Sequence, residues 1–436
     1  MFKYLFSASL LFSVSAQAKT YQLKELIELA KVHPEIKIEQ FEVEKARTLF
    51  DRIDGETRPK LSILGGLGPN KSVTGNALST TQSSGIDTVT YLAKIDLKVP
   101  LFGFNRQNDL EKAADGNLKV KQLDVKKKEA LLVKKVKEYY YGYQYASSLN
   151  EFAGSTLKDL DDVLKGMKET KNKKNSSSDE DFTKLTLFRS LAQVKKYEIE
   201  KGLAQGILGL KYITQESGPT IEQDWIEFNQ RQIPSLESLD NKLADTNIDL
   251  QRANLGVSAK SAYLTSEKKA MLPVFGLFSS FDWKSTAKST KQSAKFAYDP
   301  YNTSDFAIGV GLIWDIDFGV KSSNVSMARI DLESIKTQQA FAVKNLPIQI
   351  EKIYLDLVEA GQKASELEKS YKASKKLLNN VASGVALGIT PAKDIIESYT
   401  LKAQIYQQFT EATYNYEMKL AELSYEMGVE LDSTLL

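Results

Sequence analysis

The segment YLAKIDLKVPLFG, residues 91–103, alternates between apolar side chains and others. Its apolar members are Tyr91, Ala93, Ile95, Leu97 and Val99, and the positions between them include Lys94, Asp96 and Lys98. A period of two residues is typical of a β-strand, because successive side chains point to opposite faces of the sheet. The segment is therefore predicted to be a strand with one apolar and one charged face, although the next hundred or so residues have the pattern of a helix.

The N-terminus has the pattern of a secretory signal peptide. Lys3 precedes an apolar run over residues 5–14, and the small-residue sequence Ala16-Gln17-Ala18 follows it. The run is shorter than the ~20 residues that a transmembrane helix needs. We expect residues 1–18 to be removed during export, and no other stretch is long and apolar enough for a transmembrane helix. The mature chain is then either soluble outside the cytoplasm or spans a membrane as a β-barrel.

The composition argues against several functional classes. Lys and Arg number 58 and Asp and Glu 56, so the charge balance does not indicate a nucleic-acid partner. The sequence has no Cys and a single His, so no metal cluster is predicted. His33 precedes Pro34 at a predicted helix bend and is interpreted as structural. GGLG at 65–68 lacks the lysine of a phosphate-binding loop. Because no catalytic constellation is present, we predict a protein that is not an enzyme and uses no cofactor.

The sequence contains an internal repeat at an offset of about 214–217 residues, for example AKVHPEIKIEQ from Ala30 and ADTNIDLQRAN from Ala244. Each half is predicted to contain a helix, a β-hairpin with a polar loop, and a long helical hairpin. The predicted ranges are 22–57, 59–102 with its loop at 69–88, and 106–211 in the first half, and 235–270, 272–318 with its loop at 284–304, and 321–428 in the second. The first repeat is thus 19–211 and the second 235–428, with an inter-repeat segment at 212–234 and a tail at 429–436.

The long helices have the periodicity of coiled coils. At 1.5 Å per residue, the helical runs 106–174 and 321–387 would each be roughly 100 Å long. The leading and return helices of each half together match this length, which favours a stacked pair lying against one continuous helix. Apolar and aromatic residues repeat every seven positions, which predicts a buried seam. These residues are Leu118, Val125, Leu132, Tyr139 and Ala146 in the first half, and Ile395, Tyr399, Tyr406, Phe409, Thr413, Tyr416, Leu420, Leu423 and Met427 in the second.

Four strands are predicted in each chain, and their apolar faces run about 10 to 14 residues, enough to cross a bilayer when tilted. The strand at 305–318 again alternates, with Asp305, Asp315 and Asp317 on its polar face. An open sheet edge is not tolerated in lipid, and four strands are too few to close a barrel, so the barrel would be shared between chains. Lys94, Asp96, Lys98, Asp315 and Asp317 would then face a watery interior. The alternative, a soluble sandwich, needs more strands than the sequence supplies.

Together these features resemble TolC-type outer-membrane efflux proteins. The resemblance covers nearly the whole mature chain. It rests on LAKVHPEI (29–36), RPKLSI (58–63), VPLFGFNR (99–106), GITPAKDIIES (388–398) and YEMKLAELSYEMG (416–428). It implies a mixed α+β membrane protein, a homotrimer in which each chain adds four strands to a 12-stranded antiparallel transmembrane barrel. A long α-helical coiled-coil barrel would extend into the periplasm, and 212–234, with Trp225 and Phe228, would form an equatorial belt with the tail.

The resemblance implies an outer-membrane exit duct of a tripartite efflux or type I secretion system. Its partners would be a periplasmic adaptor, an inner-membrane pump and outer-membrane lipid, and the polar loops of the barrel would face the outside of the cell. The alternative class is a stand-alone trimeric porin or a periplasm-spanning scaffold. A porin, however, needs no helical extension of such length.

The segment GITPAKDIIES contains the candidate site residues of the periplasmic entrance. Asp394 and Glu397 lie one helical turn apart on one face. The resemblance implies that they line the entrance, where three copies would gather six carboxylates and attract cations. Without the resemblance, an ordinary solvated helix face would be the preferred explanation of the two residues.

The resemblance also implies how the entrance is closed and which turn an adaptor contacts. Members of the family can close it through an arginine linked to an aspartate in the other turn. That arginine position is Thr390 here, whereas the acid is retained as Asp181, so the charged link is either absent or rebuilt with Lys393. Ala386, Leu387 and Gly388 form the turn that an adaptor would contact, and the first turn, KETKNKKNSSS, lacks such a motif.

Overall fold

The computed structural model describes residues 20–76, 79–171, 179–216, 218–221, 226–289, 291, 294–296, 298–386 and 392–431. The chain is mainly helical with one four-stranded antiparallel sheet. It divides into two compact units. The sheet unit comprises residues 40–123 and 249–342, and the helical unit comprises residues 1–39, 124–248 and 343–436.

The elements follow one another in an order that occurs twice: a short strand, two helices, two longer strands, a long helix and a return helix. They are β1 (Thr20–Tyr21), α1 (Leu23–Lys31), α2 (Pro34–Gly55), β2 (Lys60–Asn76), β3 (Ser79–Phe102), α3 (Arg106–Lys171), α4 (Asp179–Thr214), β4 (Thr220–Ile221), α5 (Leu236–Thr246), α6 (Ile248–Lys269), β5 (Val274–Thr286), β6 (Thr303–Ile313), α7 (Val320–Ala386) and α8 (Ala392–Met427). The predicted division into two repeats with a linking segment stays a prediction. Within the described ranges, none of these helices combines the length and apolarity needed to cross a membrane.

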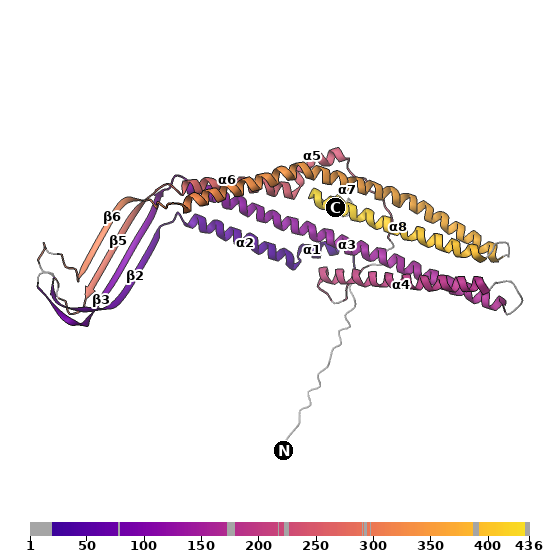
Figure 1. The fold of residues 1–436 in the computed structure, drawn as a ribbon, viewed down its shortest axis with the longest axis horizontal. Helices are drawn as coiled ribbons and strands as arrows, with labels where there is room; N and C mark the ends of the chain where they lie inside the picture. Colours follow the sequence, from indigo (N-terminus) through magenta and orange to yellow (C-terminus); the bar gives the residue numbers. More distant parts are fainter. Residues whose placement is uncertain are drawn as a thin grey trace, which may run out of the picture. The chain divides into compact units, whose positions relative to one another are not determined.

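The strands of the sheet unit pair in the order β2-β3-β5-β6, each antiparallel to its neighbour (Figure 1). The central pairing, β3 with β5, joins strands from the two halves of the sequence. Strands β2 and β6 form the two edges, and no further described strand pairs with either. The sheet therefore presents two open rows of backbone hydrogen-bonding groups.

The prediction of a polar loop over 69–88 is wrong. Strand β2 continues to Asn76 and β3 begins at Ser79, with irregular register at Asn70, Lys71 and Val73. The ladder is made by backbone groups, so it needs no apolar side chains, and the segment is rich in Thr, which favours strands. The second predicted loop, 284–304, agrees better, since β5 ends at Thr286 and β6 begins at 303.

Strand β6 ends at Ile313, five residues before the predicted end of the hairpin at 318. The strand ends where its partner does, since Ile313 pairs with Val274, the first residue of β5, and Asp317 belongs to the start of the next helix. Asp317 Oδ1 accepts hydrogen bonds from the backbone N–H groups of Gly319 (3.2 Å) and Lys321 (2.9 Å). An aspartate that satisfies these otherwise unpaired donors favours the start of a helix, and α7 begins at Val320. Asp317 therefore caps a helix rather than continuing a strand.

In the helical unit the predicted seam of α8 is buried. Thr413, Tyr416, Leu420, Leu423 and Met427 are each at most 2% exposed. The remaining seam residues, Ile395, Tyr399, Tyr406 and Phe409, are at most 8% exposed. Aromatic packing continues it, since the rings of Phe152 on α3 and Tyr406 stack with centroids 4.3 Å apart. The interpretation of this stripe as core is confirmed.

The predicted leading helix 22–57 is two helices, α1 and α2. The break falls at Val32 and His33, because Pro34 disfavours the helical conformation in the residue before it. His33 is 4% exposed, and its Nε2 lies 3.1 Å from the carbonyl oxygen of Tyr212. Its Nδ1 lies 3.4 Å from the backbone N–H of Glu35. The histidine therefore joins the break to the end of α4, which agrees with a structural role.

Candidate functional site

The polar face of the sheet carries a cluster of charges. The register places Lys94, Asp96 and Lys98 on one face of β3, and it brings Asp282 of β5 opposite Lys94. Lys94 Nζ lies 3.4 Å from Asp282 Oδ1 and 3.6 Å from Asp96 Oδ1. Asp305 of β6 follows in the same row. Sequence reasoning missed Asp282: alternation around Phe281 and Trp283 could have indicated its face, but only the register shows its partner.

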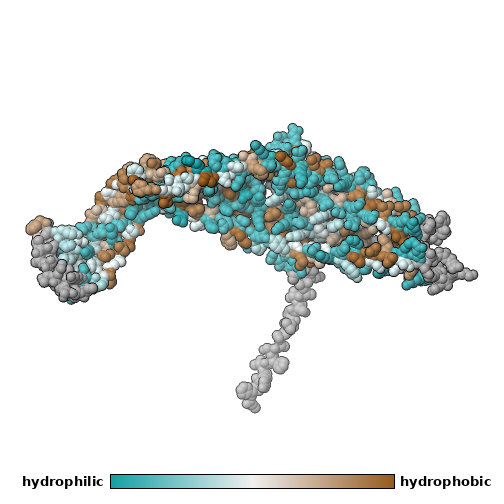
Figure 2. All heavy atoms as spheres, viewed as in Figure 1, coloured by the Kyte–Doolittle hydropathy of each residue, from teal (hydrophilic) through white to brown (hydrophobic). Residues whose placement is uncertain are grey.

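The opposite face of the sheet is apolar and exposed. Side chains that share this face are Leu61, Ile63 and Leu67 of β2, Tyr91 and Ile95 of β3, Phe281 and Trp283 of β5, and Phe306, Ile308, Val310 and Leu312 of β6. All of them are at least 37% exposed, and Val310 reaches 73%. Hydrophobic residues are visible at the surface along the sheet and where it meets the helices (Figure 2). A continuous apolar face of this kind indicates a surface that lipid or another chain covers.

Aromatic residues gather at the end of the sheet that adjoins the helices. The ring of Phe102 lies 5.0 Å from that of Phe104 and 6.3 Å from that of Phe275. Trp314 directly follows the end of β6, and its indole N–H donates a hydrogen bond to the carbonyl oxygen of Met271 at 3.0 Å. Amphipathic and aromatic rings are the side chains that proteins place at the boundary between hydrocarbon and water.

Four helix ends lie at one end of the helical unit, where α3 ends and α4 begins and where α7 ends and α8 begins (Figure 1). One buried apolar cluster links all four helices near these ends. Its residues are Leu160 of α3, Leu185 of α4, Leu378 of α7, and Ile395 and Tyr399 of α8. The packing of the two hairpins therefore positions the first turn of α8, which carries the predicted acidic pair.

The acidic pair is partly neutralised within α8. Lys393 Nζ lies 3.5 Å from Glu397 Oε1, and both side chains are 66% exposed. Asp394 lies in the first helical turn, where the helix dipole favours an acidic side chain. Lys393 thus has an ion-pair partner in its own helix, and the suggested link to the other turn stays a prediction.

The other predicted tip residues are less fully described. Asp181 lies in α4 and Ala386 is the last residue of α7, but their side chains are not described. Thr390, Leu387 and Gly388 lie outside the described residues.

Asp315 and Asp317 were predicted to share the polar face with Lys94, but both follow the end of β6. Asp317 caps α7, as described above, and the backbone carbonyl oxygen of Asp315 accepts a hydrogen bond from Lys321 Nζ. The structure therefore places both residues in the connection between sheet and helix.

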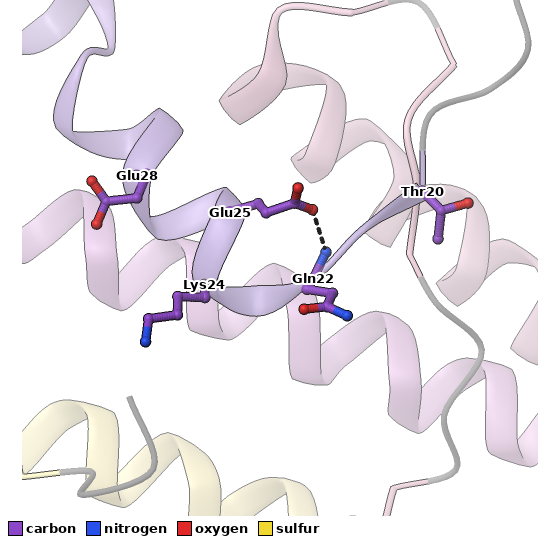
Figure 3. A pocket seen from close by; sticks show the side chains of 5 residues that line it. All are labelled: Thr20, Gln22, Lys24, Glu25 and Glu28. Atoms are coloured by element: carbon purple, nitrogen blue, oxygen red, sulfur yellow. Dashed lines mark hydrogen bonds between the residues drawn. The ribbon is translucent and has the colours of Figure 1, made fainter. Parts of the chain in front are cut away.

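One hollow of the helical unit belongs to the N-terminal end of α1. This hollow, of about 780 Å³, is lined by Thr20, Gln22, Lys24, Glu25 and Glu28. Glu25 turns back to accept a hydrogen bond from the backbone N–H of Gln22 at 3.0 Å, while Lys24 and Glu28 point away from it (Figure 3). These contacts form the N-terminal cap of α1. In the part of the chain that the structure covers, no three His, Asp or Glu side chains are grouped as a metal site would require.

The sheet and the long helical hairpins define the fold of outer-membrane channel proteins. The match to the CmeC outer membrane channel of Campylobacter jejuni covers 99% of this chain and 94% of CmeC, with a TM-score of 0.77 and 11% identity. The match to the outer membrane protein VceC of Vibrio cholerae covers 94% of this chain and 97% of VceC, with a TM-score of 0.77 and 12% identity. The match to the open state of the Neisseria gonorrhoeae MtrE outer membrane channel covers 94% of this chain and 89% of MtrE, with a TM-score of 0.76 and 16% identity.

The similarity is one of structure. No protein-family model and no curated protein sequence matches the chain. The predicted resemblance to TolC-type outer-membrane efflux proteins is confirmed for the fold.

Proposed function

We propose that this chain is one subunit of a homotrimeric outer-membrane exit duct, which passes substrates from the periplasm to the outside of the cell. The observation that carries the proposal is an antiparallel sheet with an exposed apolar face and two open edges. Its four strands are an even number, so β6 of one copy can pair antiparallel with β2 of the next. Three copies of four strands then close a 12-stranded barrel, which leaves no unpaired edge in lipid.

The two faces of the sheet suit the two environments of such a barrel. The apolar face would contact the hydrocarbon of the outer membrane, and the aromatic cluster of Phe102, Phe104 and Phe275 would lie near its boundary. The polar face, with Lys94, Asp96, Lys98 and Asp282, would line the aqueous lumen. Asp315 and Asp317 would lie where the barrel passes into the helices.

The helical unit supports the periplasmic part of the proposal. Its long hairpins would form a coiled-coil barrel whose entrance carries Asp394 and Glu397. A periplasmic adaptor would contact the turn containing Ala386, Leu387 and Gly388, and an inner-membrane pump of a tripartite efflux or type I secretion system would supply the cargo. The solved channels with the same fold support an outer-membrane location.

A pair of neighbouring substitutions tests the barrel. Ile308→Lys places a charge on the apolar face, whereas Ala307→Lys places the same charge on the polar face of the same strand. A Lys facing the bilayer midplane costs roughly 2–4 kcal/mol, so Ile308→Lys should reduce the amount of trimer in the outer membrane. Ala307→Lys should assemble normally. A native mass of one or two protomers for the wild-type protein in mild detergent, or equal assembly of both variants, would contradict the proposal.

Co-purification distinguishes the exit duct from a stand-alone porin or a scaffold. After chemical cross-linking in cells, we expect the trimer to be recovered together with an adaptor and an inner-membrane pump. Recovery of a conducting trimer without either partner would favour the porin.

A further inference from the structure

One row of the polar face combines two lysines with an aromatic ring. Lys60 of β2 pairs with Lys98 of β3, which pairs with Phe278 of β5, which pairs with Gly309 of β6. The row lies near the helix-side end of the sheet, because β2 begins at Lys60 and β3 ends at Phe102. The four residues lie side by side across the sheet, so their side chains project from the same face.

The two lysines of this row are not neutralised by a described acidic group. Like charges directly opposite each other destabilise a sheet, and Lys60 and Lys98 are direct cross-strand neighbours. Both side chains are exposed, and neither forms an ion pair with any residue in the described ranges. The nearest acid on β3, Asp96, lies 3.6 Å from Lys94, which also pairs with Asp282. The row therefore retains two positive charges per chain.

Phe278 differs from the polar side chains that share its face. Its ring lies over Gly276 and Gly311, where an added methyl group would come within 3.4 Å of the ring. At Gly309, directly opposite, an added methyl group would meet nothing within 4 Å. A hollow of about 390 Å³ lies beside the ring. Its lining includes Lys98, Phe278, Gly309 and Gly311, together with Asp96, the carboxylate that pairs with Lys94. The ring of Phe278 thus packs over Gly276 and Gly311, and the absence of a side chain at Gly309 leaves space beside the ring.

We propose that Lys60, Lys98 and Phe278 form a binding row for small organic anions that carry an aromatic ring. The ammonium groups attract the anionic group, and the phenyl ring offers a face on which a second ring packs with centroids about 4.5–7 Å apart. This inference rests on the proposed exit duct, in which three copies would place six lysines and three phenylalanines around the lumen. It adds a preference for aromatic anions in the barrel, separate from the acidic periplasmic entrance.

Single-channel recording of the purified trimer in a planar bilayer tests the row. Benzenesulfonate is added on the side of the β-hairpin loops, and the concentration that halves the current is measured. Methanesulfonate supplies the charge without the ring, and phenyltrimethylammonium supplies the ring with the opposite charge. We expect benzenesulfonate to block at concentrations at least tenfold below those of both comparison ions.

Three variants assign the block to this row. In K60Q/K98Q the half-blocking concentration of benzenesulfonate should rise at least tenfold, and removal of a like-charge pair should not impair folding. In F278L it should rise about fivefold while the weak effect of methanesulfonate stays unchanged. The matched control is K284Q on the same face of β5, because Lys284 Nζ binds the carbonyl oxygen of Pro300 at 2.9 Å and lies outside the row. This control should behave as the wild type.

The outcomes separate this inference from the exit duct. A conducting trimer that benzenesulfonate blocks no better than methanesulfonate, or equally in K60Q/K98Q, overturns the binding row and leaves the duct intact. An equal loss of block in K284Q also overturns it, since the effect would then reflect total charge. A wild-type protein that forms no trimer and no conductance overturns the exit duct and this inference together.

Discussion

At the scale of single residues, local partners decide the chemistry of the candidate sites. Lys393 lies one helical turn before Glu397 and pairs with it, so the first turn of α8 carries less negative charge than its carboxylates alone suggest. Lys94 similarly holds both Asp96 and Asp282. The pair of Lys393 with Glu397 follows from its i,i+4 spacing in the sequence. The pair of Lys94 with Asp282 instead needs the pairing of two strands almost two hundred residues apart.

We predict that the charges of the α8 turn set the cation preference of the channel in opposite directions. Lys393→Ala should raise the ratio of cation to anion permeability, because it removes one positive charge per chain beside Asp394 and Glu397. Replacing Asp394 and Glu397 together by Ala should lower the ratio and remove block by multivalent cations added from the periplasmic side. Reversal potentials in a salt gradient measure both effects. Unchanged selectivity in the double variant would show that the acids belong to an ordinary solvated helix face.

A pH dependence of stability is predicted from His33. Burial lowers its pKa below the ordinary value, and Lys128 and Lys135 act in the same direction against an opposing effect of Glu35. Since Tyr212 offers a carbonyl oxygen to Nε2, this nitrogen carries the proton and Nδ1 accepts from the N–H of Glu35. The unfolded chain then binds a proton more readily than the folded chain. Stability should therefore fall as the pH drops below about 6.5.

His33→Asn provides the matched variant, because Asn does not titrate and can cap a helix. The midpoint of urea unfolding, followed by circular dichroism in detergent, should decrease less between pH 7.5 and pH 5.5 in this variant than in the wild type. An identical decrease in both proteins would assign the pH dependence to other groups.

At the scale of elements, close packing of α4 on α3 depends on glycine. Gly202, Gly206 and Gly209 on α4 approach Ala146, Tyr143 and Tyr139 of α3 in that order. A Cβ atom at Gly209 would lie 2.4 Å from Cδ1 and 2.5 Å from Cγ of Tyr139, too close for the ring to remain in place. The absence of side chains at these positions lets the two helices approach each other.

Gly209→Ala is expected to destabilise the protein by about 1–3 kcal/mol, the usual cost of overfilling a packed interface. Gly154→Ala on α3 is the control, because an added methyl group there meets nothing within 4 Å. That variant should be stabilised by about 0.5–1 kcal/mol through the lower conformational freedom of Ala in the unfolded chain. Thermal unfolding midpoints of the two variants should thus move in opposite directions, and a stabilised Gly209→Ala would contradict the close packing.

At the scale of the whole molecule, the exit duct predicts which end faces the outside of the cell. The connection between β5 and β6 is polar, and Asn302 joins its two ends, since the side chain of Asn302 binds Ser289 Oγ at 2.7 Å and the backbone N–H of Thr286 at 3.2 Å. Ser289 is thus engaged within the loop, and the exposed Lys291 is the better position for a label. In an outer-membrane barrel, long connections face outward and short ones inward.

Lys291→Cys should react with a membrane-impermeant maleimide on intact cells. Lys165→Cys, at an exposed position of α3 in the helical unit, should react only after the outer membrane has been permeabilised. The chain contains no native Cys, so background labelling is absent. Labelling of Lys291→Cys from the periplasm alone would reverse the orientation.

The sequence by itself determined the elements and their faces. The period of two over 91–103 and the seven-residue repeat of α8 are local, and local periodicity decides which side chains share a face. Helix α3 begins at 106 as predicted, and the buried seam from Ile395 to Met427 agrees with the structure.

The tertiary structure alone decided how those faces meet. That β2 and β3 continue through the polar residues 69–76 and 79–88 depends on backbone pairing, which side-chain hydrophobicity does not report. Strand register decides that Lys98 lies between Lys60 and Phe278. It also decides that Lys94 lies opposite Asp282. A register shift of one residue would move each of these side chains to the opposite face, and no local pattern records the register of strands so distant in the chain.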